Sequence, residues 1–155
     1  MLRAELDAID LKILKELQHD GRMTNVELSE RVGISAPPCL RRVRKLEEAG
    51  IIEGYHAALN ARRLGYDLVA FCAVGLKHQS EAQLKSFAAA TEGWPLVRQA
   101  WMVSGESDFL LHCVAENLTQ FQDFVIEVLT ANETVDTVKT MLTIRPVKRL
   151  GLVDI

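Results

Sequence analysis

The chain contains 155 residues, of which 48% are apolar and 25% are charged, a composition typical of soluble globular protein and sufficient for one compact domain or two small ones. Its formal charge of -3 excludes attraction of the whole chain to nucleic acid or to a membrane, so any basic site must be local. No apolar run reaches the roughly 18 residues that span a bilayer, and the acidic start lacks a signal peptide's apolar stretch, so we expect a cytoplasmic protein with no membrane partner.

The spacing of apolar residues predicts two helices near the start of the chain. The first is capped by Asp7 and ends before Gly21. The second begins at Thr24, which forms a capping-box pattern with Glu27, and it ends at Gly33. The predicted buried side of this second helix consists of Val26, Leu28 and Val32.

A third helix is predicted from a cap at Ser35 to about Ala49, where Gly50 closes it. The connection of residues 33–35 is short and contains a glycine, which is typical of a helix-turn-helix. The segment from Arg31 to Lys45 also holds five basic residues and no acidic one. These features predict a three-helix, winged-helix-like domain that binds double-stranded DNA.

In a helix-turn-helix the second helix of the motif enters the major groove, with its N-terminal residues on the base edges. At 100° per residue, Arg41, Arg44 and Lys45 share one side of the third helix. Arg42 lies off that side and is expected to reach a flanking phosphate. The predicted buried seam is Leu40, Val43 and Leu46. The candidate DNA-binding residues are Thr24, Asn25, Ser35, Ala36, Pro37, Pro38, Cys39, Arg41, Arg42, Arg44 and Lys45.

Other interpretations of these residues stay open. The basic run can be a solvated helix face that Glu47 and Glu48 balance. Asn25 can be a helix cap, and Cys39 can be a packing residue. The three cysteines have no CxxC spacing and the four histidines have no metal-ligand spacing, so no metal site is expected.

After Gly50, alternating residues predict a strand that includes Gly54 to Leu59, followed by a polar link over 60–63. The segment 66–77 is apolar on both faces, which predicts a central strand covered on each side. The domains are therefore expected at 1–52 (helix-turn-helix), 53–64 (hinge strand and linker) and 65–155.

Two further helices are predicted in the last domain, opened by Ser80 with Gln83 and by Asn117 with Gln120. Strands are predicted over 96–104, 108–115 and 135–147, with a turn at Gly105. The order βαββαβ is that of a ferredoxin-like sandwich. The whole chain is expected to have an α+β fold.

At this point the residues resemble the Lrp/AsnC (leucine-responsive and asparagine-responsive, feast/famine) transcription regulators. The resemblance covers essentially the whole chain. It rests on VGIS followed by PCLRRVRKLEEAGII, on MVSGESDFLL with its Gly105-to-Asp108 G-x-x-D, and on the final DTVKTMLTIRPVK.

This resemblance implies a homodimer paired through the hinge strand and the sandwich sheets, with four dimers often forming an octamer. It also implies an amino-acid effector, and no other cofactor is expected. Asp108 would pair the effector's ammonium group, while the backbone of 105–107 would donate to its carboxylate. An apolar effector such as leucine or methionine is expected. The candidate effector-binding residues are Met102, Ser104, Gly105, Ser107 and Asp108, with Thr137 and Thr140 as weaker candidates.

The function that follows is a sequence-specific transcription regulator whose DNA binding or assembly responds to an amino acid. One alternative is a DNA-architectural protein with little base readout, which the short Ser35 and Cys39 side chains leave open. A second alternative is a small enzyme with His78 or His112 as base. No acid-base pair accompanies either histidine in the sequence, so no catalytic residue is expected.

Overall fold

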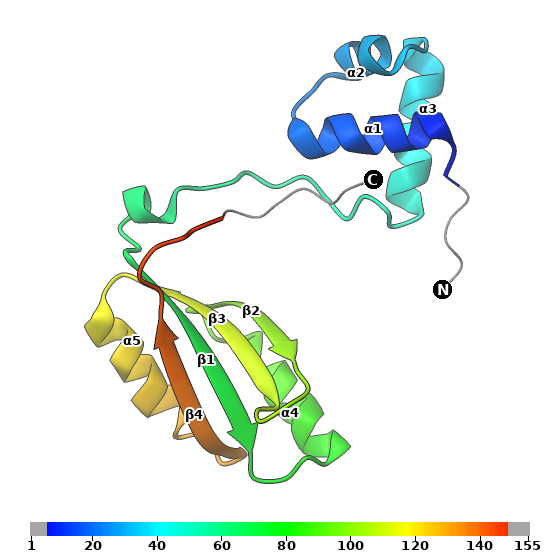
Figure 1. Ribbon diagram of the computed structural model, residues 1–155. Coiled ribbons are helices and arrows are strands. Elements are labelled where there is room, and N and C mark those ends of the chain that lie inside the picture. Colours follow the sequence, from blue (N-terminus) through cyan, green and yellow to red (C-terminus); the bar gives the residue numbers. More distant parts are fainter. Residues whose placement is uncertain (1–5, 149–155) are drawn as a thin grey trace. The chain divides into compact units, whose positions relative to one another are not determined.

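The computed structural model describes residues 6–148. The chain divides into two compact units, of which the first runs to Ala58 and the second is Leu59–Val147 (Figure 1). Each unit has its own hydrophobic core. The first is helical and the second is a sheet covered by helices, so the predicted α+β fold is confirmed.

The first unit contains the three predicted helices, α1 (Ala8–His19), α2 (Asn25–Val32) and α3 (Ala36–Glu48). Asp7 caps α1, because its Oδ1 accepts from the backbone N–H groups of Ile9 and Asp10 at 2.9 Å each. The residues buried between the helices are Ile13, Leu28, Val32, Cys39 and Leu46.

The buried face of α2 differs from the prediction at one residue. Val26 is 58% exposed, and the face that packs inward carries Leu28, Ser29 and Val32. The reason is angular, because Val26 lies about 160° around the helix from Leu28 when each residue turns the chain by about 100°.

The second unit begins with a short 3₁₀ turn, η1 (Ala61–Leu64), and continues in the predicted βαββαβ order. Helix α5 extends directly into a π turn, η2 (Val125–Leu129). The four strands form one antiparallel sheet in the order β2-β3-β1-β4, as a ferredoxin-like sandwich requires. The remaining elements are β1 (Leu68–Leu76), α4 (Glu81–Thr91), β2 (Val97–Met102), β3 (Phe109–Ala115), α5 (Leu118–Phe124) and β4 (Val135–Leu142).

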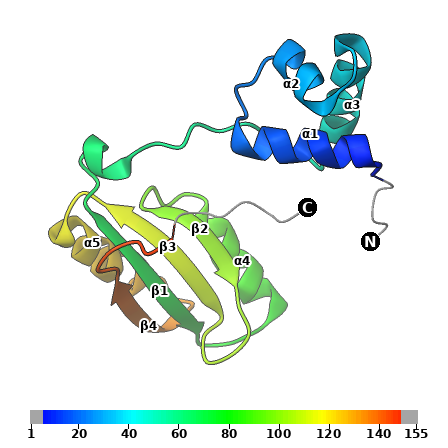
Figure 2. The ribbon, with the colours of Figure 1, turned by 45° about the horizontal axis from the view of Figure 1, so that its top comes forward.

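Both long helices of this unit cover the same face of the sheet (Figures 1 and 2). Phe87 of α4 and Phe121 of α5 pack with Cys72, Val74 and Leu111 of the sheet. The alternate residues of β1 are only half-buried, so within one chain the predicted covering of both faces is wrong. We call the uncovered face the open face. It carries Val69, Phe71, Ala73, Trp101, Leu110, His112 and Met141.

The predicted hinge strand is also absent from the described chain. Residues 53–60 have no strand partner among residues 6–148, and a strand exists only where another strand accepts its hydrogen bonds. The last strand is shorter than predicted, because β4 ends at Leu142 and not at Val147.

Candidate nucleic-acid interface and ligand site

The turn between α2 and α3 is fixed by local hydrogen bonds. Thr24 and Glu27 form the predicted capping box, in which the Thr24 N–H donates to Glu27 Oε2 at 2.8 Å and the Glu27 N–H donates to Thr24 Oγ1 at 3.2 Å. The Thr24 hydroxyl also lowers the pKa of the Glu27 carboxyl. Gly33 ends α2 with a φ of 79°, a left-handed conformation that favours glycine. These contacts set the start of α3.

Asn25 connects the two helices of the motif. Its Nδ2 donates to the Ala36 carbonyl at 2.9 Å, and its side chain is half-buried. Ser35 is the N-cap residue of α3, as predicted, but its exposed hydroxyl makes no capping hydrogen bond. Asn25 therefore has a structural role at the turn, whereas the Ser35 hydroxyl is directed to solvent.

The buried seam of α3 is Cys39, Val43 and Leu46, not the predicted Leu40, Val43 and Leu46. Residues spaced i, i+4 and i+7 stay within about 60° of one another around a helix, whereas steps of three drift by about 60° each. Cys39 is 0% exposed and burial raises the pKa of its thiol, so the expectation that it contacts DNA is wrong. The same angles around the helix predict this seam from the sequence alone.

The opposite side of α3 is an exposed stripe that lines an open groove of about 540 Å³. We call it the α3 stripe. Its chemistry changes along the helix, from apolar at the N-terminal end to basic in the middle and acidic at the C-terminal end. Its members are Pro37, Leu40, Arg41, Arg44, Lys45 and Glu48. Three of the four predicted basic contacts therefore lie together on one surface.

Arg42 has a different environment from the other basic residues of α3. Its Nη1 lies 2.7 Å from Asp7 Oδ2 and 2.7 Å from Asp10 Oδ1, so it joins α3 to the first turn of α1. The Asp10 backbone N–H, and then Arg42, lower the pKa of the Asp7 carboxyl. Two carboxylates engage the charge of Arg42, which sets it apart from the α3 stripe; its expected phosphate contact stays a prediction.

The predicted ligand turn lies between β2 and β3. The Leu76 N–H donates to Asp108 Oδ2 at 2.7 Å, and the Asp108 N–H donates to the Val74 carbonyl at 2.9 Å. Asp108 thus ties the turn to the end of β1, where a register shift between Gly75 and Leu76 interrupts the pairing with β4. Ser104 and Gly105 are exposed, and Ser107 is half-buried.

The turn also contacts the last strand. Lys139 Nζ lies 3.1 Å from Glu106 Oε2, and Lys139 belongs to β4. Both side chains are exposed, so this ion pair contributes little stability, but it marks which part of β4 the turn approaches.

The structure does not bring the two candidate threonines together. Thr137 pairs with Gly75 on the open face, where a Cβ added to Gly75 would lie 2.5 Å from Thr137 Oγ1. Thr140 faces the helices and lines a groove of about 320 Å³ with Phe121 and Ile126. Side chains three residues apart on a strand point to opposite faces, so a pocket on one face of a single chain holds one of them at most.

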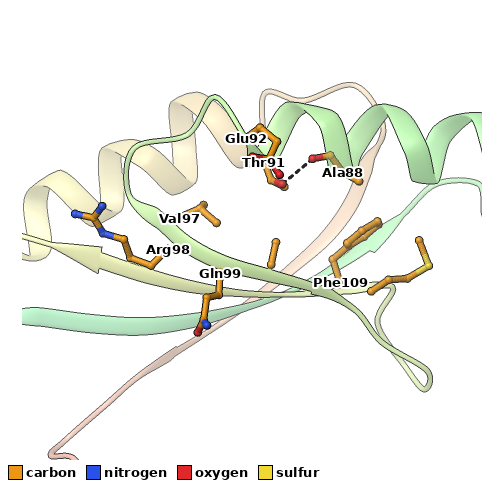
Figure 3. A pocket seen from close by; sticks show the side chains of 9 residues that line it. Ala88, Thr91, Glu92, Val97, Arg98, Gln99 and Phe109 are labelled. Carbon is orange, nitrogen blue, oxygen red and sulfur yellow. Dashed lines mark hydrogen bonds between the residues drawn. The ribbon is translucent and has the colours of Figure 1, made fainter. Parts of the chain in front are cut away.

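Met102 lies at the end of β2 on the helix side of the sheet, and it is 60% exposed. It lines a cavity of about 300 Å³ between α4 and β2 that also includes Ala88, Thr91 and Phe109 (Figure 3). Figure 3 shows Val97 pointing toward α4, whereas Gln99 points away from it. The cavity is lined by charged and polar side chains as well as apolar ones, and by none of residues 104–108.

His112, Cys72 and Cys113 are packed within the second unit. His112 stacks on Phe71 with ring centroids 5.3 Å apart, and burial, with Arg98 nearby, lowers its pKa. The buried Cys72 and Cys113 sulfurs lie 4.0 Å apart and both are free thiols. Among residues 6–148 no group of three metal-ligating side chains comes together.

Family models match both halves of the chain. Residues 6–53 match a winged helix-turn-helix DNA-binding model, and residues 69–153 match an Lrp/AsnC ligand binding domain. No helix among the described residues is long and apolar enough to cross a membrane.

Whole-length relatives agree with these matches. The chain is 77% identical over 155 residues to the leucine-responsive regulatory protein of Rhizobium meliloti (strain 1021), covering 100% of this chain and 99% of the relative. It is 37% identical over 145 residues to the protein of the same name from Escherichia coli (strain K12), covering 94% of this chain and 88% of the relative. A transcriptional regulator of Neisseria meningitidis, solved as a complex with L-Met, has 38% identity and a TM-score of 0.88, with 93% of each chain covered.

Proposed function

The chain belongs to the Lrp/AsnC family and is a transcription regulator with an amino-acid-responsive domain, and from this premise we propose which residues meet DNA and which meet the amino acid. Because the family consists of transcription regulators, the enzyme alternative that used His78 or His112 is excluded.

We propose that α3 enters the major groove with its exposed stripe against the DNA. The observation that carries this proposal is that Arg41, Arg44 and Lys45 share one surface while Arg42 is held elsewhere. Arginine and lysine side chains at this position reach guanine edges or phosphates. The exposed Ser35 and Pro37 start the helix nearest to the bases, and Thr24, Ala36 and Pro38 flank them.

The amino-acid site is proposed at the turn of residues 104–108. Asp108 uses one carboxylate oxygen for the Leu76 N–H, which leaves the other for an ammonium group. The backbone N–H groups of the turn then donate to the carboxylate of the amino acid. Met102, which is 60% exposed next to the turn, favours an apolar side chain such as that of leucine or methionine, and a similar regulator was solved with L-Met.

The active assembly is proposed to be a homodimer that can associate further to an octamer. Two surfaces are proposed to meet a second copy. One is the open face, which no helix of residues 6–148 covers, and the other is the segment 54–59, which pairs with no strand among those residues. The segment 53–64 then acts as the hinge between residues 1–52 and 65–155. The regulator is proposed to work in the cytoplasm, where its DNA is.

The salt dependence of DNA binding tests the role of the α3 stripe. If a dimer uses Arg41, Arg44 and Lys45 of both copies on about six phosphates, its affinity falls on the order of a thousandfold between 50 and 200 mM salt. Replacing all three by alanine should remove most of this slope. The exposed Arg62 lies outside the helix-turn-helix, so Arg62→Ala is the matched control and should keep the slope. A triple variant with the wild-type slope would contradict the proposal.

A further inference from the structure

Leu40 is an exposed apolar side chain of the α3 stripe to which the proposed function gives no role. It is 39% exposed. It lies between Pro37 and Arg41 along the groove. The N-terminal half of the stripe therefore presents hydrocarbon directly beside its basic residues.

The position of Leu40 along α3 determines which part of the DNA it contacts if α3 enters the major groove. Leu40 is in the N-terminal half of a helix that begins at Ala36, and this is the half of a recognition helix that lies on base edges. Neither Leu40 nor Pro37 has a side-chain hydrogen-bond donor or acceptor. The apolar group on base edges in the major groove is the 5-methyl group of thymine.

The charges around Leu40 favour DNA as the occupant of this groove. Arg41, Arg44 and Lys45 place three positive charges along the same surface, and its only acid, Glu48, is at the far end of the helix. A phosphate backbone on both sides of the groove would complement this arrangement. Leu11 of α1 has a similar exposure of 37%, but it is outside the α3 stripe.

We propose that Leu40 is a specificity-determining residue that recognises thymine by packing against its 5-methyl group. This inference rests on the proposed function, because it requires α3 to enter the major groove. It assigns sequence preference to an apolar contact that adds to the hydrogen bonds of Arg41 and Arg44. Removing one buried methyl group corresponds to a loss of about fourfold in affinity.

The experiment compares DNA sites that differ by single methyl groups. A site is first selected from a random DNA pool with the full-length protein. Each thymine in it is then replaced, one at a time, by deoxyuridine, which lacks only the 5-methyl group. We expect the wild-type protein to lose about fourfold in affinity at the thymine that Leu40 contacts. Leu40→Ala should bind the thymine and deoxyuridine sites equally, whereas Leu40→Met should retain the discrimination.

Leu11→Ala is the matched control and should discriminate as the wild type does. Thermal unfolding and the salt slope of Leu40→Ala should match those of Leu11→Ala, which separates a lost contact from a lost fold. The inference is overturned if no thymine is sensitive, or if Leu40→Ala keeps the wild-type sensitivity at every thymine. If no deoxyuridine replacement changes the affinity but the salt dependence still requires the basic residues of α3, only the role of Leu40 is refuted. If replacing Arg41, Arg44 and Lys45 by alanine leaves the salt dependence unchanged, the placement of α3 in the major groove is refuted.

Discussion

At the scale of single residues, neighbours decide what each basic side chain of α3 can do. Arg41 and Arg42 are adjacent and chemically identical, yet Arg42 is held by two carboxylates and Arg41 lines the exposed stripe. The sequence predicts both as DNA contacts because the run of basic residues is visible in it, whereas the contact between Arg42 and the N-terminus of α1 is not. Asp7 and Asp10 are more than thirty residues away along the chain, and only the packed unit brings them to Arg42.

This difference predicts opposite phenotypes for the two arginines. Arg42→Ala should lower the thermal unfolding temperature of the first unit, because it leaves the Asp10 carboxylate, which is largely buried, without its partner. Arg41→Ala should weaken DNA binding and leave the unfolding temperature unchanged. Calorimetry and a DNA titration on both variants, with Arg42→Lys as the charge-retaining control, measure the contrast.

The same network makes stability depend on pH. The pKa of Asp7 is lowered in the folded protein from its ordinary value of 3.8, so its contribution is present above that value and is lost as pH falls through the lower, folded pKa. The difference in unfolding temperature between wild type and Arg42→Ala should therefore shrink at acid pH. An equal difference at pH 7 and pH 2 would contradict this role of Arg42.

At the scale of secondary-structure elements, the features that depend on nearby residues could be predicted from the sequence. The caps at Asp7, Thr24, Ser80 and Asn117 each accept a backbone N–H two or three residues ahead, so their signals lie within a few positions. The seam of α3 is encoded locally as well, because Cys39, Val43 and Leu46 lie within about 60° of one another around the helix. The hinge strand has no such local signal, because residues 53–60 pair with no strand among residues 6–148.

The sheet also has a feature that depends on residues outside the single chain, and this feature can be tested. The sequence predicts that β1 is covered on both faces, and residues 6–148 of one chain supply helices for only one of them. On the open face, Phe71 and Leu110 are half-buried, and Trp101 and Met141 are exposed. Together they form an apolar surface of the kind found at protein interfaces. A second copy of the sheet would bury it, which reconciles the prediction with the single chain.

Charging this face should therefore separate the subunits. We expect Phe71→Asp to sediment as a monomer at micromolar concentration, where the wild type sediments as a dimer or a multiple of one, because an aspartate buried between two sheets has no partner charge. Ile126→Asp introduces the same charge on η2, in the helix layer, and should keep the dimer. A wild-type monomer, or a dimeric Phe71→Asp, would show that the sheets do not form the interface.

At the scale of the whole molecule, the net charge of -3 acts on DNA at long range, whereas the basic residues of the α3 stripe act on it at contact distance. The acidic excess disfavours nonspecific attraction, so DNA affinity must come from the local cluster that the stripe supplies. The candidate DNA residues belong to the first unit and the ligand turn to the second, and each unit has a separate core. We therefore expect the amino acid to act on DNA binding through the arrangement of copies in the oligomer.

The last prediction is that amino-acid binding at Asp108 and DNA binding are coupled. Coupling of this kind usually amounts to about 1–3 kcal/mol, or roughly 5- to 150-fold, and it must be reciprocal. The factor by which the amino acid changes DNA affinity should then equal the factor by which DNA changes amino-acid affinity. Calorimetry with each of the twenty amino acids identifies the effector, and two titrations in the presence of the other ligand measure the factors.

The variants of the turn are chosen to separate charge from structure. Asp108→Asn retains an oxygen that accepts the Leu76 N–H but removes the negative charge that pairs an ammonium group, so it should keep the fold and lose at least tenfold in amino-acid affinity. Glu106→Gln removes the other acid of the same turn, which pairs with Lys139, and should bind as the wild type does. If Asp108→Asn binds the amino acid normally, the pocket lies elsewhere. If none of the twenty binds the wild type at millimolar concentration, the domain responds to a different metabolite.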